Sequence, residues 1–194
     1  TDSLVNPVEF FYKLNHPEID ELRPNQKETL EEWNLRVDKN ENDHIIQLDT
    51  GAGKTLIGLY AAESLRRRKN GKVLYLCVNN YLAEQTIEKA AEYGIKTSAY
   101  LNSVWCDENE YLDNSQICIT NYDSVFNTYS KFKKDEIVGI IFDDSHFAVD
   151  LFEKQFTLSL EDRDLVNEFY DLFGNNENIN NLKELRIIMS TDDK

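Results

Sequence analysis

The segment DTGAGKT at residues 49–55 constrains the fold of this 194-residue chain more than any other feature. An apolar stretch at residues 44–48 precedes it and predicts a β-strand, while residues 54–69 predict an α-helix. Glycines let the backbone turn tightly, so that several N–H groups point at one anion, and the helix N-terminus adds its dipole. The order strand, glycine-rich loop, helix therefore predicts a site that binds phosphate groups.

The residues of this loop have separate expected roles in binding ATP with Mg²⁺. We expect Lys54 to reach the β- and γ-phosphates and the Thr55 hydroxyl to be a Mg²⁺ ligand. The remaining cofactor-binding positions contribute mainly backbone N–H groups, and they are Thr50, Gly51, Ala52 and Gly53.

One position departs from the general phosphate-loop pattern. Leu48 stands five residues before Gly53, where that pattern has its first glycine. The alternative interpretation is a simple glycine turn between a strand and a helix, with Lys54 in solvent. The sequence context on both sides of the loop favours phosphate binding.

A second polar cluster follows a predicted buried strand at residues 137–142. This strand leads directly into Asp143 and Asp144. A carboxylate at the carboxyl edge of a sheet, opposite a phosphate loop, is a common way to hold Mg²⁺. We expect Asp143 to hold the metal and Asp144 to orient or deprotonate the attacking water. The alternative is a polar strand exit whose aspartates cap a helix.

Strand and helix patterns alternate along most of the chain. Further strands are predicted at 73–78, 116–120 and 185–189, and residues 102–115 are predicted to form an acidic loop. Further helices are predicted at 8–12, 24–37, 81–93, 122–131, 147–156 and 160–173. This alternation predicts an α/β fold with a parallel sheet and helices on both faces.

The composition bounds the classes of function. The formal charge is 21 − 36 = −15, so any contact with nucleic acid must use a local basic patch or another domain. No run of 18 apolar residues predicts a transmembrane helix, and we expect no membrane partner. Three scattered cysteines, with Cys77 expected in the core, favour reduced thiols and a cytoplasmic or nuclear location.

Several short segments together resemble one family of ATPases. DDSH at residues 143–146 resembles motif II of superfamily 2 helicases and translocases, the DEAH/DExH box, and DTGAGKT resembles their motif I. LRPNQ at residues 22–26 resembles their upstream adenine-reading element. VNNYLAEQ at residues 78–85 resembles motif Ia.

The resemblance extends towards the end of the chain. ITNYDS at residues 119–124 resembles a later motif that contacts the nucleic-acid backbone, and STD at residues 190–192 lies where motif III is expected. The order and spacing of these motifs hold from about residue 22 to residue 191.

The resemblance implies a fold and a site. Residues 22–194 would form a RecA-like P-loop NTPase domain, preceded by an extension at residues 1–21, and a second RecA-like domain would follow. Arg23 and Gln26 would contact the nucleotide, with the Gln26 amide on the adenine edge. Catalytic roles fall to Lys54, Asp144 and His146, although a loop histidine without a catalytic role is an equal alternative for His146.

Two functions remain open from the sequence. The first is an ATP-driven nucleic-acid helicase or translocase domain, with DNA favoured over RNA as partner and weak hydrolysis by the isolated domain. The second is a catalytically weak ATP-binding regulatory or scaffold domain, whose acidic surface binds protein partners. Asp144 and the net charge of −15 favour the second. The family has glutamate at the position of Asp144, and water positioning is sensitive to errors of about 1 Å.

Overall fold

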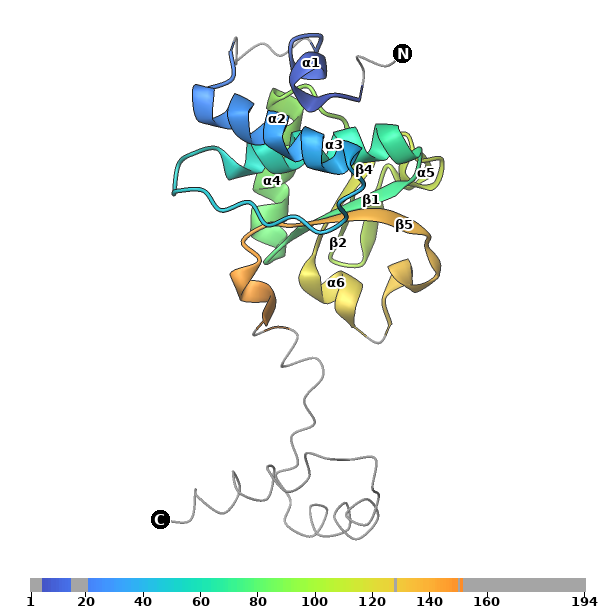
Figure 1. The fold of residues 1–194 in the computed structure, drawn as a ribbon. Helices are drawn as coiled ribbons and strands as arrows, with labels where there is room; N and C mark the ends of the chain where they lie inside the picture. Colours follow the sequence, from blue (N-terminus) through green and yellow to red (C-terminus); the bar gives the residue numbers. More distant parts are fainter. Residues whose placement is uncertain (1–4, 15–20, 128, 150, 152–194) are drawn as a thin grey trace, which may run out of the picture. The chain divides into compact units, whose positions relative to one another are not determined.

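A mostly parallel five-stranded sheet, in the order β3-β2-β4-β1-β5, organises the molecule (Figure 1). The computed structural model describes residues 5–14, 21–127, 129–149 and 151. The strands are β1 (Lys72–Cys77), β2 (Thr97–Leu101), β3 (Val104–Cys106), β4 (Ile117–Asn121) and β5 (Ile137–Phe142). The helices are α1 (Pro7–Phe11), α2 (Pro24–Asp38), α3 (Lys54–Lys69), α4 (Asn80–Glu92), α5 (Glu108–Leu112), α6 (Tyr122–Phe126) and the 3-10 helix η1 (Lys131–Lys134).

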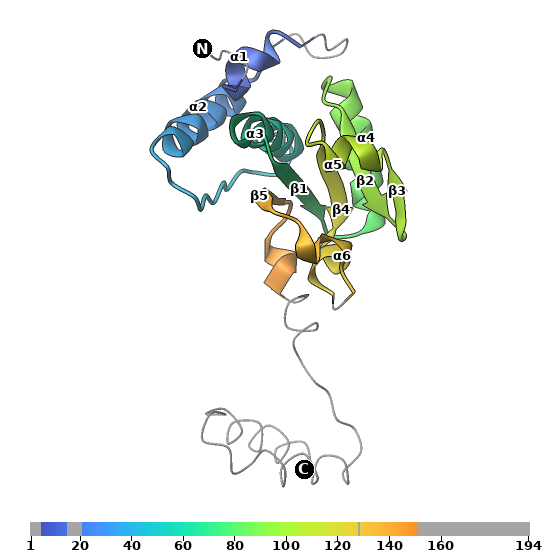
Figure 2. The ribbon, with the colours of Figure 1, turned by 90° about the vertical axis from the view of Figure 1, so that its right-hand side faces the viewer.

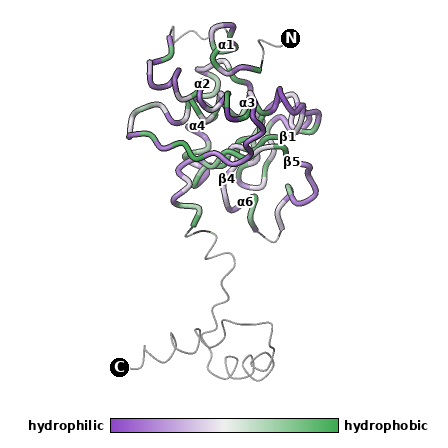
Figure 3. The backbone as a smooth tube through the Cα atoms, viewed as in Figure 1, coloured by the Kyte–Doolittle hydropathy of each residue, from purple (hydrophilic) through white to green (hydrophobic). Residues whose placement is uncertain are grey.

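Alternation along the central strands divides the core into two layers. Val73, Tyr75 and Cys77 of β1 face one layer, which they share with apolar side chains of α1, α2, α3 and α4. Leu74 and Leu76 face the other layer, with side chains of α5, α6 and η1. Helices therefore cover both faces of the sheet, as predicted, and Figure 2 shows α3 and α4 beside the strands. Apolar residues, green in Figure 3, run through these strands.

The helix at residues 8–12 is confirmed as α1, and it contributes to the main core. Asn6 caps it, accepting hydrogen bonds from the N–H groups of Val8 and Glu9. Phe10 and Phe11 are buried, and both rings contact that of Tyr60 in α3. The first helix therefore packs directly on the helix that follows the glycine-rich loop.

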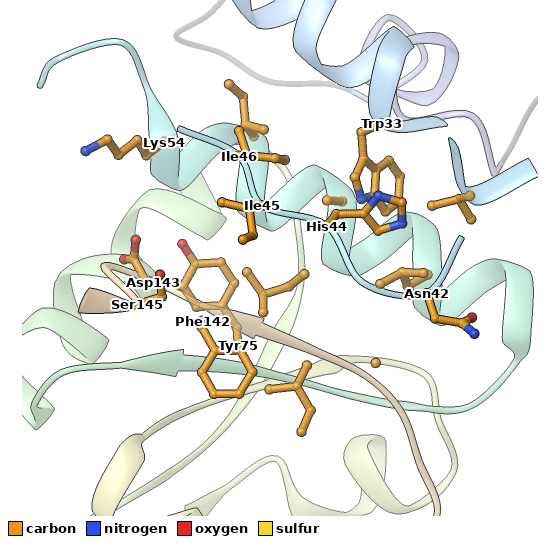
Figure 4. A pocket seen from close by; sticks show the side chains of 18 of the residues that line it. Trp33, Asn42, His44, Ile45, Ile46, Lys54, Tyr75, Phe142, Asp143 and Ser145 are labelled. Carbon is orange, nitrogen blue, oxygen red and sulfur yellow. The ribbon is translucent and has the colours of Figure 1, made fainter. Parts of the chain in front are cut away.

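The predicted strand at residues 44–48 is wrong. These residues pair with no strand in the described part of the chain, and the Ile45 side chain is 97% exposed. A strand is stable only when a neighbouring strand satisfies its backbone groups. The segment lies instead across a cavity from β5, so its apolar composition does not produce a ladder (Figure 4).

Two other local predictions are corrected. The acidic segment 102–115 is not only a loop, since it contains β3, antiparallel to β2, and α5. Its Trp105 ring stacks on Tyr111 at 5.2 Å between centroids and meets Tyr100 at 4.9 Å. These aromatic contacts order a segment whose polarity alone favours a loop.

The helix predicted at residues 122–131 ends early, at Phe126. Asn127 is extended, and its side chain donates to the Asp123 carbonyl and accepts from the Tyr129 N–H. Such local side-chain bonds compete with helical hydrogen bonds. The chain continues as η1, with Phe132 in the core.

Other helices and strands agree with the patterns. Helix α3 and strand β5 have the predicted bounds, although β5 is only half buried because its outer edge has no partner among the described residues. The predicted helix at 160–173, the strand at 185–189 and the STD segment lie outside the described residues. In the described part, no helix has the length and apolar character needed to cross a membrane.

Candidate functional site

The glycine-rich loop adopts the backbone conformation that its sequence predicts. Gly51 and Gly53 have φ values of 80° and 89°, in the left-handed region that side chains disfavour. A Cβ atom on Gly53 would also lie 2.2 Å from Nε2 of Gln26. Helix α3 begins at the next residue, Lys54, so its free N–H groups lie at the end of the loop.

Two residues of the upstream element reach this loop, Arg23 from the N-cap of α2 and Gln26 from its first turn. The Gln26 side chain is buried and donates from Nε2 to the Ala52 carbonyl at 3.2 Å, while its Oε1 accepts from the Arg23 N–H at 3.0 Å. Arg23 donates from Nη1 to the Gly51 carbonyl at 3.1 Å. The structure therefore places the predicted nucleotide contacts of α2 against the phosphate loop.

The acidic pair lies where β5 ends. The Asp143 N–H donates to the Leu76 carbonyl of β1 at 2.9 Å, which continues the sheet by one residue. Burial of the Asp143 carboxyl raises its pKa, and the neighbouring charge of Asp144 adds to this, while Lys54 opposes it. Lys54 and the acidic pair therefore belong to one electrostatic site.

Asp144 has an unusual backbone. Its φ is 49°, in the left-handed region, and its side chain is exposed. Aspartate and asparagine adopt this region more readily than longer side chains do. Ser145 and His146 are exposed beyond it, and the His146 ring lies 4.1 Å from that of Phe147.

Two buried tyrosines face Asp143, and the sequence patterns did not identify them as site residues. The hydroxyl of Tyr75 in β1 points towards the Asp143 carboxyl and lowers its pKa (Figure 4). Tyr122 of α6 donates to the Asp143 carbonyl at 2.6 Å. The sequence does contain one indication for Tyr75, which is a tyrosine within an otherwise aliphatic strand. A buried hydroxyl normally has a hydrogen-bonding partner, so such a tyrosine predicts a polar group nearby.

A cavity of about 960 Å³ extends from this site along β5 (Figure 4). Lys54, Asp143 and Ser145 lie at one end, and Trp33, Asn42 and His44 lie at the other. Segment 44–48 lines one side and β5 lines the opposite side. The described residues leave this edge of the sheet open next to the loop.

The residues present suit a hard cation such as Mg²⁺. Thr55 offers a hydroxyl and Asp143 a half-buried carboxylate, and Mg²⁺ prefers oxygen ligands, several of them from water or substrate. The raised pKa of Asp143 reflects a carboxylate that burial and a like charge destabilise. The described part of the chain has no cluster of three or more His, Cys, Asp or Glu that could hold a metal unaided.

Other motif residues are structural in this fold. Thr120 is buried and donates to the Tyr100 carbonyl at 2.6 Å, and Tyr122 is buried as described above. Their side chains are therefore not available to a nucleic-acid backbone. Cys77 and Cys118 are buried, and burial raises the pKa of each thiol to about 12, while Cys106 is exposed.

Two runs of basic residues, 66–69 and 131–134, lie in the described part of the chain. Arg66 and Arg67 bind Glu63 at 2.7 and 2.6 Å, and Arg68 binds Asp38 at 2.5 Å, so this cluster is engaged within the protein. In η1, three exposed lysines surround a buried phenylalanine, and these lysines are Lys131, Lys133 and Lys134.

Comparison with known proteins gives one result. The family model described as type III restriction enzyme, res subunit, matches residues 19–183. This match spans the upstream element, the glycine-rich loop and the acidic pair. No curated protein matches the chain.

Proposed function

Since the chain belongs to the family of the type III restriction enzyme res subunit and is a superfamily 2 helicase-like ATPase domain, we propose that it binds Mg²⁺–ATP. The supporting observation is that Lys54, in the first turn of α3, and Asp143, at the end of β5, line the same cavity, and that Lys54 lowers the pKa of Asp143. The loop from Thr50 to Gly53 and Lys54 bind the phosphates, and Thr55 and Asp143 bind the metal. Bound Mg²⁺ would neutralise charge on the phosphate oxygens.

The adenine end of the nucleotide is assigned to α2. Gln26 and Arg23 lie beside the loop and offer donors and acceptors of hydrogen bonds. In this structure both side chains donate hydrogen bonds to carbonyl groups of the loop. To contact adenine, the Gln26 amide exchanges the Ala52 carbonyl for the base.

In the full reaction, the domain couples ATP hydrolysis to movement along nucleic acid, with DNA favoured, when joined to a second RecA-like domain. Asp144 orients the attacking water, and His146 links this site to the nucleic-acid side. The exposed lysines of η1 form the local basic patch that a chain of net charge −15 needs for phosphate contact. Residues 22–194 are the motor domain in this proposal, and residues 1–21 are its extension.

ATP binding tests the proposal directly. We expect Mg²⁺ to strengthen binding of a fluorescent ATP analogue, and Lys54→Ala to weaken it at least about tenfold, because an ammonium–phosphate contact is lost. Lys89→Ala, which removes an exposed lysine of α4, is the charge-matched control. Equal affinities of the two variants would contradict the assignment of the loop.

The scaffold alternative is distinguished by turnover. We expect the isolated chain to hydrolyse ATP slowly, since charges from a second domain contribute strongly to phosphoryl transfer. A chain joined to its second domain should hydrolyse ATP faster with duplex DNA present, and Lys54→Ala should abolish this. Binding without hydrolysis under every nucleic-acid condition would favour the scaffold function.

A further inference from the structure

Asp143 is restrained through each of its polar groups. Its N–H donates to Leu76, its carbonyl accepts from Tyr122, and its carboxyl faces the Tyr75 hydroxyl, which lowers the carboxyl pKa (Figure 4). The first two contacts fix the backbone, which many strand ends require. The Asp144 N–H and the Tyr75 hydroxyl both act on the carboxylate, and of these two groups only Tyr75 comes from another strand of the sheet.

The position of Tyr75 is itself fixed by the helix of the phosphate loop. Tyr75 is buried in β1, with 1% of its surface exposed, and its ring lies against Gly58 of α3. A Cβ on Gly58 would lie 2.9 Å from Tyr75 Cε2 and 3.0 Å from its hydroxyl oxygen. Glycine weakens a helix interior, so its presence here makes room for the tyrosine.

These contacts join the two halves of the site. Gly58 is one helical turn after Lys54, so Tyr75 lies between the first turns of α3 and the acidic end of β5. Figure 4 shows the Tyr75 hydroxyl pointing towards Asp143, on the same side as Lys54. The chain thus has a rigid connection between the phosphate side and the metal side.

We propose that Tyr75 is a positioning residue for the metal site, holding one oxygen of Asp143 through its hydroxyl so that the other faces the nucleotide-bound cation. The inference rests on the proposed Mg²⁺–ATP site. A carboxylate that is held in advance loses less freedom when the cation binds. Tyr75 therefore affects the metal-dependent part of nucleotide affinity rather than phosphate binding in general.

Tyr75→Phe removes the hydroxyl and preserves the ring. In the 194-residue chain, we expect the Mg²⁺ concentration for half-maximal binding of the fluorescent ATP analogue to rise about tenfold, as for loss of a hydrogen bond to a charged group. In EDTA, the affinity of Tyr75→Phe for the analogue should stay within about twofold of that of the unaltered chain, because no metal is then bound. Tyr60→Phe is the matched control. It also removes a buried tyrosine hydroxyl, but that hydroxyl donates to the Tyr93 carbonyl and not to Asp143.

A double-mutant comparison identifies the route of the effect. In an Asp143→Asn background, Tyr75→Phe should change the Mg²⁺ requirement by less than about twofold, because the carboxylate that it positions is gone. An equal effect in both backgrounds would mean that Tyr75 acts elsewhere, and this result would overturn the inference.

The two proposals fail in different ways. If the unaltered chain binds Mg²⁺–ATP and Tyr75→Phe matches Tyr60→Phe, the positioning role is wrong and the ATP site stands. If the unaltered chain shows no metal-dependent binding and Lys54→Ala changes nothing, both are overturned. If Tyr75→Phe does not fold, Asp143→Asn alone is compared with the unaltered chain. The compared quantities are the Mn²⁺ and Mg²⁺ concentrations for half-maximal binding of the analogue. Unchanged concentrations refute a metal role for this carboxylate and therefore for its tyrosine.

Discussion

The contact of Gly58 with Tyr75 allows one prediction to be worked in numbers. Gly58→Ala places a Cβ atom 2.9 Å from a ring carbon of Tyr75, in a core where both α3 and β1 are fixed. Overpacking of this kind costs about 1–3 kcal/mol. Replacing glycine by alanine within a helix returns about 1 kcal/mol. The net expectation is a loss of about 0–2 kcal/mol of stability.

The same substitution should have the opposite sign when the ring is absent. In a Tyr75→Leu background the alanine methyl has space, so only the helix preference acts and Gly58→Ala should stabilise by up to about 1 kcal/mol. The difference between the two backgrounds is a coupling of about 1–3 kcal/mol, which is the overpacking cost itself. Tyr122→Leu is the control background, because Tyr122 belongs to the core layer on the other face of the sheet.

Urea unfolding, followed by far-UV circular dichroism, measures all the variants on one scale. The slope of each transition must stay constant for the midpoints to report stability. An equal loss on Gly58→Ala in the original and the Tyr75→Leu backgrounds would falsify the packing argument. It would mean that Gly58 is required for a reason other than the tyrosine ring.

Three further predictions follow from described contacts. Asp144→Glu should lower stability by about 1 kcal/mol in urea unfolding because of the left-handed backbone at φ 49°, while Asp144→Asn should not. Slight desolvation of the exposed Cys106 thiol, followed by the Asp107 charge, raises its pKa above the ordinary value, so its alkylation by iodoacetamide should still accelerate above pH 9, and should do so at lower pH in Asp107→Asn. Glu63→Gln breaks a buried pair with two arginines and should cost about 3 kcal/mol, whereas the exposed Glu32→Gln should cost under about 0.5 kcal/mol.

Local patterns predicted the helices and strands that carry the site. Helix α3 was predictable because a glycine-rich loop fixes its start and a run of cations marks its last turn. Strand β5 was predictable because a continuous apolar run ends at two aspartates. Both signals lie within a few residues of the feature that they predict, so no knowledge of distant contacts was needed.

Features that depend on distant contacts were not predictable in this way. Residues 44–48 have the composition of a strand, but a strand also needs a partner, and the side of the segment that faces β5 borders a cavity. Strand β2 was missed because its residues, 97–101, are short and mixed in polarity, and its pairing with β4 decides its structure. Tyr75 has the pattern of an ordinary strand residue, and its position beside Asp143 depends on how distant parts of the chain meet.

The backbone at Asp144 changes the weight of the two functions that the sequence left open. A shorter carboxylate in place of glutamate favoured a catalytically weak domain when only the sequence was considered. The structure gives this aspartate a physical cause, since a left-handed residue disfavours longer side chains. The substitution then follows from the shape of the loop and is no longer by itself a sign of lost activity. In the proposed site, the metal-dependent part of nucleotide binding depends on how Asp143 is held, which is the property that Tyr75→Phe alters.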